Sequence, residues 1–122
     1  DYPRELGCIF LGDGATEIAP ALGQAIDAGI QVLQPLEAKA GLDVRTLKPQ
    51  YGQDLTFMGN IDVRKMSASR VELEEEVRSK LEVAMQGGGY IYHSDHSVPP
   101  TVSWTNYVTL MEFLERYGSY RW

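Results

Sequence analysis

Apolar residues gather in four short runs along the chain, and segments with helical spacing separate them. The runs are "CIFL" (8–11), "IQVLQPL" (30–36), "LTFMG" (55–59) and "YIY" (90–92). Continuous apolar runs of this length are typical of parallel strands that are buried on both faces. The pattern therefore predicts a chain that alternates strand and helix.

Four helices are predicted between and after these strands, because apolar residues recur there three or four positions apart. They are expected at about 16–28, from Asp43 to Gly52, after Ser69, and from about Ser103 to Gly118. Asp43 is a good N-cap, and Ser69 with Glu72 forms the S-x-x-E pattern of a capping box.

The two later helices each carry an apolar row that predicts a buried face. Leu73, Val77, Leu81 and Ala84 form this row in the third helix, whose acidic outer face within 70–80 is expected to be solvated surface. In the last helix the predicted core row is Trp104, Tyr107, Val108, Met111 and Leu114.

The order of elements predicts an α/β fold of parallel strands joined by right-handed crossovers. A closed (β/α)₈ barrel needs about 250 residues, so a chain of 122 residues supplies about half of one. We expect a single domain over 1–122, with four parallel βα units. Two sheet edges would carry unpaired backbone groups, which favours pairing with a second copy or with a missing half over a smaller doubly wound sheet.

Composition narrows the class of protein and its partners. The formal net charge of −6 disfavours binding to nucleic acid. No segment approaches the ~20 apolar residues that span a membrane. The single cysteine, Cys8, excludes an internal disulfide and fits a reducing, cytoplasmic location; its apolar neighbours predict that it is buried.

Polar side chains follow every predicted strand. They are Asp13 after the first strand, Glu37 and Lys39 after the second, Asn60 and Asp62 after the third, and His93, Asp95 and His96 after the fourth. Ligands of parallel α/β proteins bind at the carboxyl ends of the strands. The sequence therefore predicts a site for a small-molecule substrate on this rim, whereas the opposite loops offer less chemistry.

Each of these residues also has a purely structural interpretation. Asp13 can cap a helix, Glu37 and Lys39 can form a surface ion pair, and Asn60 can hydrogen-bond its own turn. His93 and His96, with Asp95 between them, form either an acid–base or metal cluster or a loop that is bonded to backbone.

Three segments resemble the uroporphyrinogen decarboxylase superfamily, which also holds cobalamin- and corrinoid-dependent methyltransferases. They are "LQPLEAKAGLDVRTLKPQYG", "LTFMGNIDVR" and "GYIYHSDHSVPPTVSWTNY". The resemblance covers the last four βα units of the family's barrel. It implies a C-terminal half-barrel whose N-terminal half would supply the substrate-binding arginines and the catalytic aspartate.

The resemblance also implies a chemistry. It implies decarboxylation of a carboxylated substrate, such as a tetrapyrrole, without a cofactor, and His96 in "HSVPP" matches the loop histidine that faces the tetrapyrrole. In the methyltransferase branch, the zinc motif H-x-C falls on Leu11 and Asp13, so both expected ligands are replaced. A different metal site of Asp13, Glu37 and His96 stays open, although no bound metal is predicted.

The expected site combines the strand ends with this resemblance. His96 and Asp13 are the predicted catalytic residues. The predicted substrate-binding residues are Glu37, Lys39, Asn60, Asp62, His93 and Asp95. The alternatives are a corrinoid-dependent methyltransferase-like protein and a non-catalytic half-barrel that homodimerises as a binding or assembly module.

Overall fold

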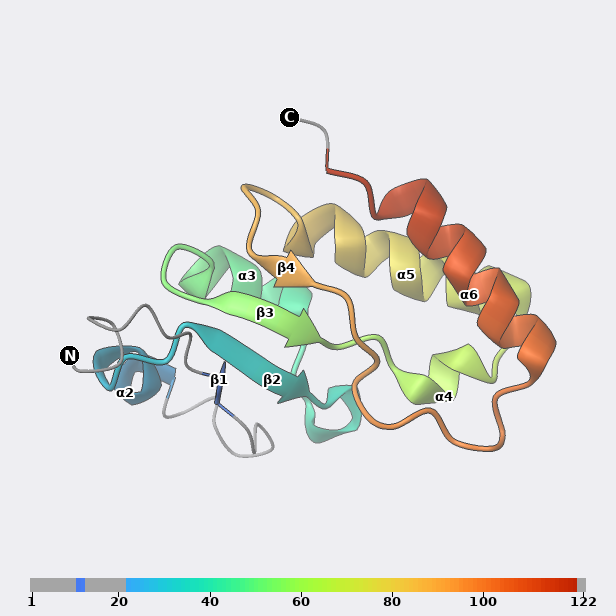
Figure 1. Cartoon of the computed structure of the whole chain (residues 1–122), viewed down its shortest axis with the longest axis horizontal. Coiled ribbons are helices and arrows are strands. Elements are labelled where there is room, and N and C mark those ends of the chain that lie inside the picture. Colours follow the sequence, from blue (N-terminus) through green and yellow to red (C-terminus); the bar gives the residue numbers. More distant parts are fainter. Residues whose placement is uncertain (1–10, 13–21, 121–122) are drawn as a thin grey trace.

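The computed structural model describes residues 11–12 and 22–120, and its ordered elements alternate as the sequence predicts (Figure 1). In chain order they are β1 (Leu11–Gly12), α2 (Leu22–Asp27), β2 (Val32–Leu36), the 3₁₀ turn η3 (Ala38–Ala40), α3 (Val44–Tyr51), β3 (Thr56–Gly59), α4 (Val63–Met66), α5 (Arg70–Ala84), β4 (Tyr90–Ile91) and α6 (Trp104–Tyr117). Cys8, Asp13 and residues 16–21 of the predicted first helix lie outside the described residues.

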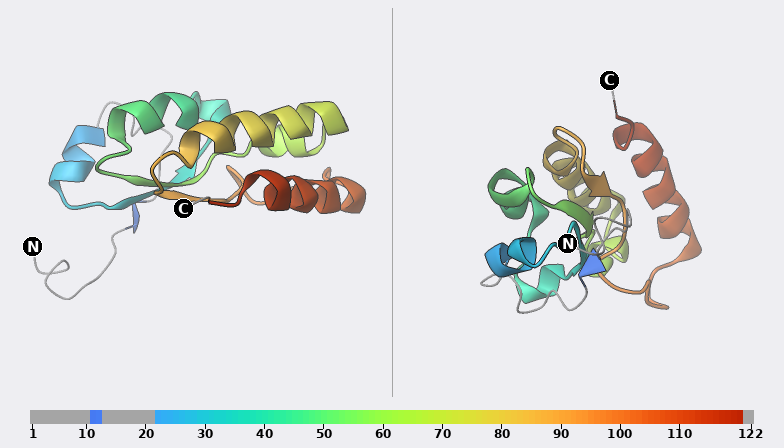
Figure 2. Two further views of the ribbon diagram at one scale, coloured as in Figure 1. Left: turned by 90° about the horizontal axis from the view of Figure 1, so that it is seen from above. Right: turned by 60° about the vertical axis from the view of Figure 1, so that its left-hand side comes forward.

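The four strands form one parallel sheet in the order β1-β2-β3-β4. The prediction that the strands run in one direction is therefore confirmed, and the arrangement is compatible with part of a TIM barrel. Figure 2 shows α3 and α5 over one face of this sheet, with α6 alongside α5.

The core lies between the sheet and the helices that cover it. The register pairs Leu33 with Phe57 and Phe57 with Tyr90, so these side chains point to the same face. All three are buried in the cluster that also holds Val77 of α5 and Leu47 of α3. Burial of each such side chain contributes roughly 1.5–3 kcal/mol. Ile91, one position after Tyr90, is 45% exposed.

Both predicted caps, Asp43 and Ser69, are present, and Ser103 at the expected start of the last helix is a third cap. The Asp43 carboxylate accepts a hydrogen bond from the Arg45 backbone N–H at the start of α3. Ser69 and Glu72 form the reciprocal capping box of α5, and Ser103 caps α6. These local signals worked because each cap needs only residues within one turn.

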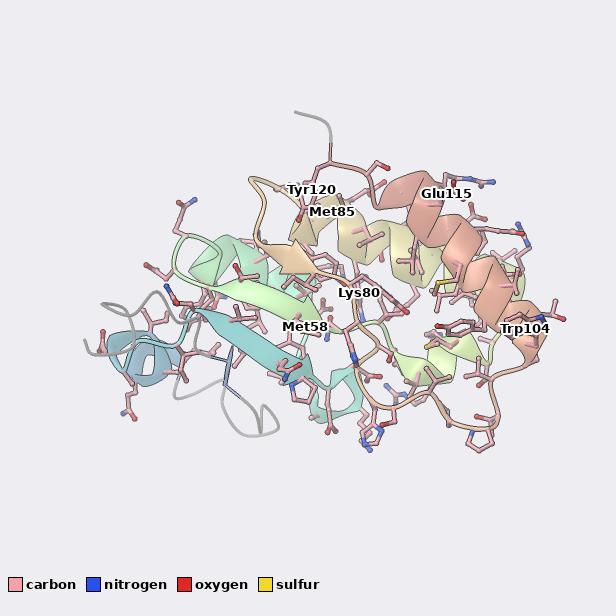
Figure 3. All side chains as sticks on the ribbon, viewed as in Figure 1. Met58, Lys80, Met85, Trp104, Glu115 and Tyr120 are labelled. Atoms are coloured by element: carbon pink, nitrogen blue, oxygen red, sulfur yellow. The ribbon has the colours of Figure 1, made fainter. Side chains whose placement is uncertain are left out.

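The predicted buried face of α6 is wrong in part. The structure buries Thr109, Leu110 and Phe113, while Trp104 at the start of the helix is 77% exposed (Figure 3). Val108 is exposed as well. Tyr107, Met111 and Leu114 pack against the core only in part.

A tertiary contact explains this rotation of α6. The Asn106 side-chain amide donates hydrogen bonds to the carbonyl oxygens of Met66 and Ala68, at 2.8 and 3.1 Å. These carbonyls lie at and just after the end of α4. The hydrogen bonds therefore orient α6 so that its Asn106 side faces α4. A pattern of apolar residues cannot report an inward-facing amide.

Candidate functional site

The loops that follow β3 and β4 continue side by side beyond the strands. Ile61 and Ser94 form an isolated parallel bridge. The Asp95 N–H donates to the Ile61 carbonyl at 2.8 Å, and the Ile61 N–H donates to the His93 carbonyl at 3.4 Å. The parallel sheet thus brings the predicted residues of these two loops to one rim.

The Asp95 side chain connects the loops of this rim through hydrogen bonds. Its buried carboxylate accepts one hydrogen bond from the Ala38 N–H at 3.0 Å and another from the Val63 N–H at 2.9 Å. Ala38 begins the turn after β2, and Val63 begins α4. Hydrogen bonds to an ionised acceptor are about twice as strong as neutral ones. One side chain therefore links the loops after β2, β3 and β4.

Asn60 organises the same loops from within the protein. It is fully buried and adopts a left-handed backbone conformation with φ of 76°. Its side-chain oxygen accepts from the Val44 N–H, and its amide donates to the carbonyls of Leu36 and Leu42. The sequence offered this residue both a substrate role and a turn role. In the structure its amide is engaged by backbone and has no exposed surface.

Asp62 caps α4 and forms an ion pair. Its carboxylate accepts from the Arg64 backbone N–H at 2.9 Å and pairs with the Arg64 guanidinium at 2.7 Å. Burial opposes ionisation, but the hydrogen bonds and charge of Arg64 outweigh it and hold the pKa of Asp62 below its usual value. Asp62 is consequently a carboxylate that stays ionised at the rim.

A buried charge network supports the loop from the helix side. Lys80 of α5 is 3% exposed, and its ammonium donates to the Asn60 carbonyl and pairs with Glu76. Glu76 in turn accepts from the Asp62 backbone N–H at 2.9 Å. Figure 3 shows the Lys80 side chain between α5 and the end of β3.

Two charged residues of 70–80 lie away from the expected solvated outer face, since Lys80 is buried and Glu76 is partly buried. A signal for them was available in the spacing of the helix. Positions 73, 76, 77, 80, 81 and 84 form one continuous helical face. Glu76 and Lys80 belong to that inward face, and as an opposite-charge pair four residues apart they can neutralise each other there.

The remaining predicted residues are closer to solvent. Glu37 is partly buried and Lys39 is exposed, with 3.9 Å between their charged groups. His93 and His96 are both exposed. The His93 ring nitrogen Nδ1 lies 2.6 Å from the Ser94 carbonyl oxygen, and the Ser94 hydroxyl donates to the His96 carbonyl at 2.6 Å. Asp13 lies outside the described residues, so its place relative to the rim is untested.

The rim therefore contains buried side chains that are hydrogen-bonded within the fold and side chains that are more exposed. Asn60, Asp62 and Asp95 accept hydrogen bonds from backbone N–H groups. Glu37 is only partly buried and His96 is exposed. Within the described residues, no group of three or more His, Cys, Asp or Glu side chains is arranged to hold a metal ion. No helix in that part of the chain is long and apolar enough to cross a membrane.

Comparison with known families gives a match over nearly the whole chain. The family model described as "Uroporphyrinogen decarboxylase (URO-D)" matches residues 5–117, which is nearly the whole chain. No curated protein matches the chain significantly. The family match covers every described residue of the rim.

Proposed function

Because the chain belongs to the uroporphyrinogen decarboxylase family, we propose that it supplies the rim of a barrel that decarboxylates a carboxylated substrate of tetrapyrrole type. The observation that carries this proposal is the double hydrogen bond of Asp95, which holds three strand-end loops in one arrangement. A shared rim lets residues from different loops act on one bound molecule.

In this proposal the exposed and the buried rim residues have different roles. His96 and Asp13 act on the reacting group, and Glu37, Lys39 and His93 contact the substrate. Asn60, Asp62 and Asp95 shape the rim, since backbone groups and Arg64 engage their polar atoms. The positive charge of Lys39 and the imidazoles suit a substrate that carries several carboxylates.

The proposed step needs a proton donor. The bond between the carboxylate carbon and its neighbour breaks, CO₂ leaves, and the electron pair stays on the neighbouring carbon. The His96 imidazolium gives its proton to that carbon and is recharged from solvent. Imidazole is the side chain best suited to such transfer near neutral pH, and a general acid contributes typically about 10²–10⁴-fold in rate.

Replacement of one histidine at a time tests this assignment. In the intact protein, His96→Gln should lower the turnover of uroporphyrinogen about 10²–10⁴-fold, measured by chromatography of the products with fewer carboxylates. The matched variant His93→Gln should raise KM with little change in kcat, because His93 is proposed only to bind. Unchanged kcat in His96→Gln would remove this residue from the mechanism.

The sheet edges support a second part of the proposal. In the described residues β1 and β4 are edge strands, and Ile91 of β4 is 45% exposed. We propose that the N-terminal half of the barrel, or a second copy, covers this surface. A half-barrel that pairs only with its own copy would be a binding or assembly module.

The mass of the 122-residue chain in solution distinguishes these two partners. A second copy predicts a dimer by light scattering, which Ile91→Lys should weaken because a buried unpaired charge is costly. A monomer that associates only with an N-terminal half would support the enzyme and remove the homodimeric module.

A further inference from the structure

Lys48 of α3 is a buried cation that has no ionic partner among residues 11–12 and 22–120. It is 8% exposed, and its ammonium donates a hydrogen bond to the neutral carbonyl of Gly88. Every other lysine and arginine in the described residues lies within 4.0 Å of a carboxylate. The chain carries a formal net charge of −6, so carboxylates are not scarce.

Two glycines give the Lys48 side chain its space. A Cβ at Gly52 would lie 2.8 Å from the Lys48 Cδ, and a Cβ at Gly89 would lie 3.3 Å from the Lys48 Nζ and 3.5 Å from the Thr56 hydroxyl. Gly89 also has φ of 74°, a conformation that other residues rarely adopt. The ammonium thus lies close to Gly88 and Gly89, just before β4 begins. Figure 1 shows that the amino ends of β3 and β4 lie at the same end of the sheet.

A cavity of about 510 Å³ has Lys48 among its lining residues. It is lined by Lys48, Pro49, Gly52, Gln53, Gln86 and Gly87. The two glutamine amides and the lysine can all donate hydrogen bonds. Asp54 borders a smaller neighbouring cavity of about 250 Å³ and is not within ion-pair distance of Lys48 in the described residues.

We propose that this cavity binds a small oxyanion, such as inorganic phosphate or a small carboxylate, with Lys48 as the charged ligand and Gln53 and Gln86 as hydrogen-bond donors. The cavity lies at the end of the sheet opposite to the rim, so the site is distinct from the proposed decarboxylation site. A bound oxyanion would neutralise a charge that no side chain of the described residues neutralises.

The protonation behaviour of Lys48 gives this proposal a direct readout. Burial lowers the pKa of Lys48 below its usual value, because removal from water disfavours the charged ammonium. A bound anion stabilises the charged form, so it must raise this pKa. By linkage, the anion then binds more tightly as pH falls through the pKa of Lys48.

The test uses NMR of the protein with lysines labelled at Cε and Nζ, titrated with sodium phosphate or sodium acetate at constant ionic strength. The Lys48 signal should shift to saturation, and its pKa should rise in the saturated protein. Lys80 is the internal control, because it is buried but already paired with Glu76. A response to phosphate alone identifies a phosphate site, and a response to acetate as well identifies a general oxyanion site.

Variants locate the binding site. Lys48→Met should weaken binding about tenfold or more, while Lys65→Met, at an exposed lysine paired with Glu72, should leave it unchanged. If Lys48→Met fails to fold, Gln86→Leu and the wild-type NMR titration still decide the question. A Lys48 signal and pKa that neither anion moves, or equal binding in the two lysine variants, would overturn the proposal.

Discussion

The two ends of the parallel sheet handle buried charge in opposite ways. At the carboxyl end, Lys80 is paired with Glu76, and the Asp95 carboxylate accepts two backbone hydrogen bonds. At the amino end, Lys48 is also buried, and its ammonium donates to the Gly88 carbonyl. Both ends thus contain a lysine that is more than nine-tenths buried, and within the described part of the chain only Lys80 has a counter-ion.

The buried charges at the carboxyl end of the sheet stabilise the fold, whereas the buried charge at the amino end can bind a ligand. A buried charge is costly unless it is paired and hydrogen-bonded. At the carboxyl end that cost is offset within the fold, so the loops of the rim have one preferred arrangement. At the amino end the cost persists in the free protein, so an anion that arrives there gains binding free energy by reducing it.

The largest expected effect is the loss of the paired lysine. Lys80→Met leaves Glu76 buried without its partner and removes the donor to the Asn60 carbonyl. Removal of one member of a buried ion pair typically costs about 3–5 kcal/mol. Urea denaturation should show a fall of this size in the free energy of unfolding.

Two further variants control the Lys80 experiment. Lys65→Met removes an exposed ion pair and should cost less than about 1 kcal/mol. The double variant Lys80→Met/Glu76→Gln should be less destabilised than Lys80→Met alone, since no unpaired charge is left. A cost below 1 kcal/mol for Lys80→Met would show that the network does not hold the loop.

The next largest effect concerns Asp95. Asp95→Ala removes the acceptor of the Ala38 and Val63 backbone N–H groups, and an unsatisfied buried donor costs about 1–3 kcal/mol. We expect a loss of about 2–3 kcal/mol, together with faster hydrogen exchange at these two amides. Asp27→Ala, at an exposed position of α2, should change neither measurement. Unaltered hydrogen exchange at Ala38 and Val63 would show that the Asp95 hydrogen bonds do not hold these two loops in place.

Much of this arrangement could be predicted from the sequence, because its signals are local. The apolar runs predicted the parallel strands. Asp43, Ser69 and Ser103 indicated where three helices begin. The strand-end position of Asp62 and Asp95 predicted that they share a rim. The sequence did not reveal that they bind backbone, because Ala38 and Val63 come from other loops.

Lys48 was missed for a related reason. The loops at the amino end contain few titratable residues, so the sequence predicted little chemistry there. Lys48 belongs to a helix rather than to a loop, and its side chain passes close to Gly52 and Gly89, where a Cβ would approach it to 2.8 and 3.3 Å. A contact that depends on two glycines, one of them far along the chain, has no signature in local spacing.

Lys48→Met makes the same substitution at Lys48 that Lys80→Met makes at the lysine paired with Glu76. Without added anion, Lys48→Met should leave the free energy of unfolding unchanged or raise it by up to about 1 kcal/mol, because it removes a buried charge and keeps the length of the side chain. The measurement is urea denaturation beside Lys80→Met. A loss comparable to that of Lys80→Met would mean that the Gly88 contact stabilises Lys48 as well as an ion pair would.

The smallest expected effect is the pH dependence that Lys48 imposes on stability. Its folded pKa is lowered, so between that value and the ordinary 10.5 the unfolded chain binds more protons than the folded protein. The free energy of unfolding should therefore rise with pH across this window, by at most about 1.4 kcal/mol per pH unit for one group. Burial raises the pKa of Tyr92 to about 12, so this residue lowers the free energy of unfolding as pH rises above 10.

Both wild type and Lys48→Met contain the same tyrosines, so the difference between their free energies of unfolding removes the tyrosine contribution and leaves that of Lys48. This difference should shrink as pH rises toward 10.5, and a difference that stays constant with pH would show that Lys48 is as well solvated in the fold as in the unfolded chain.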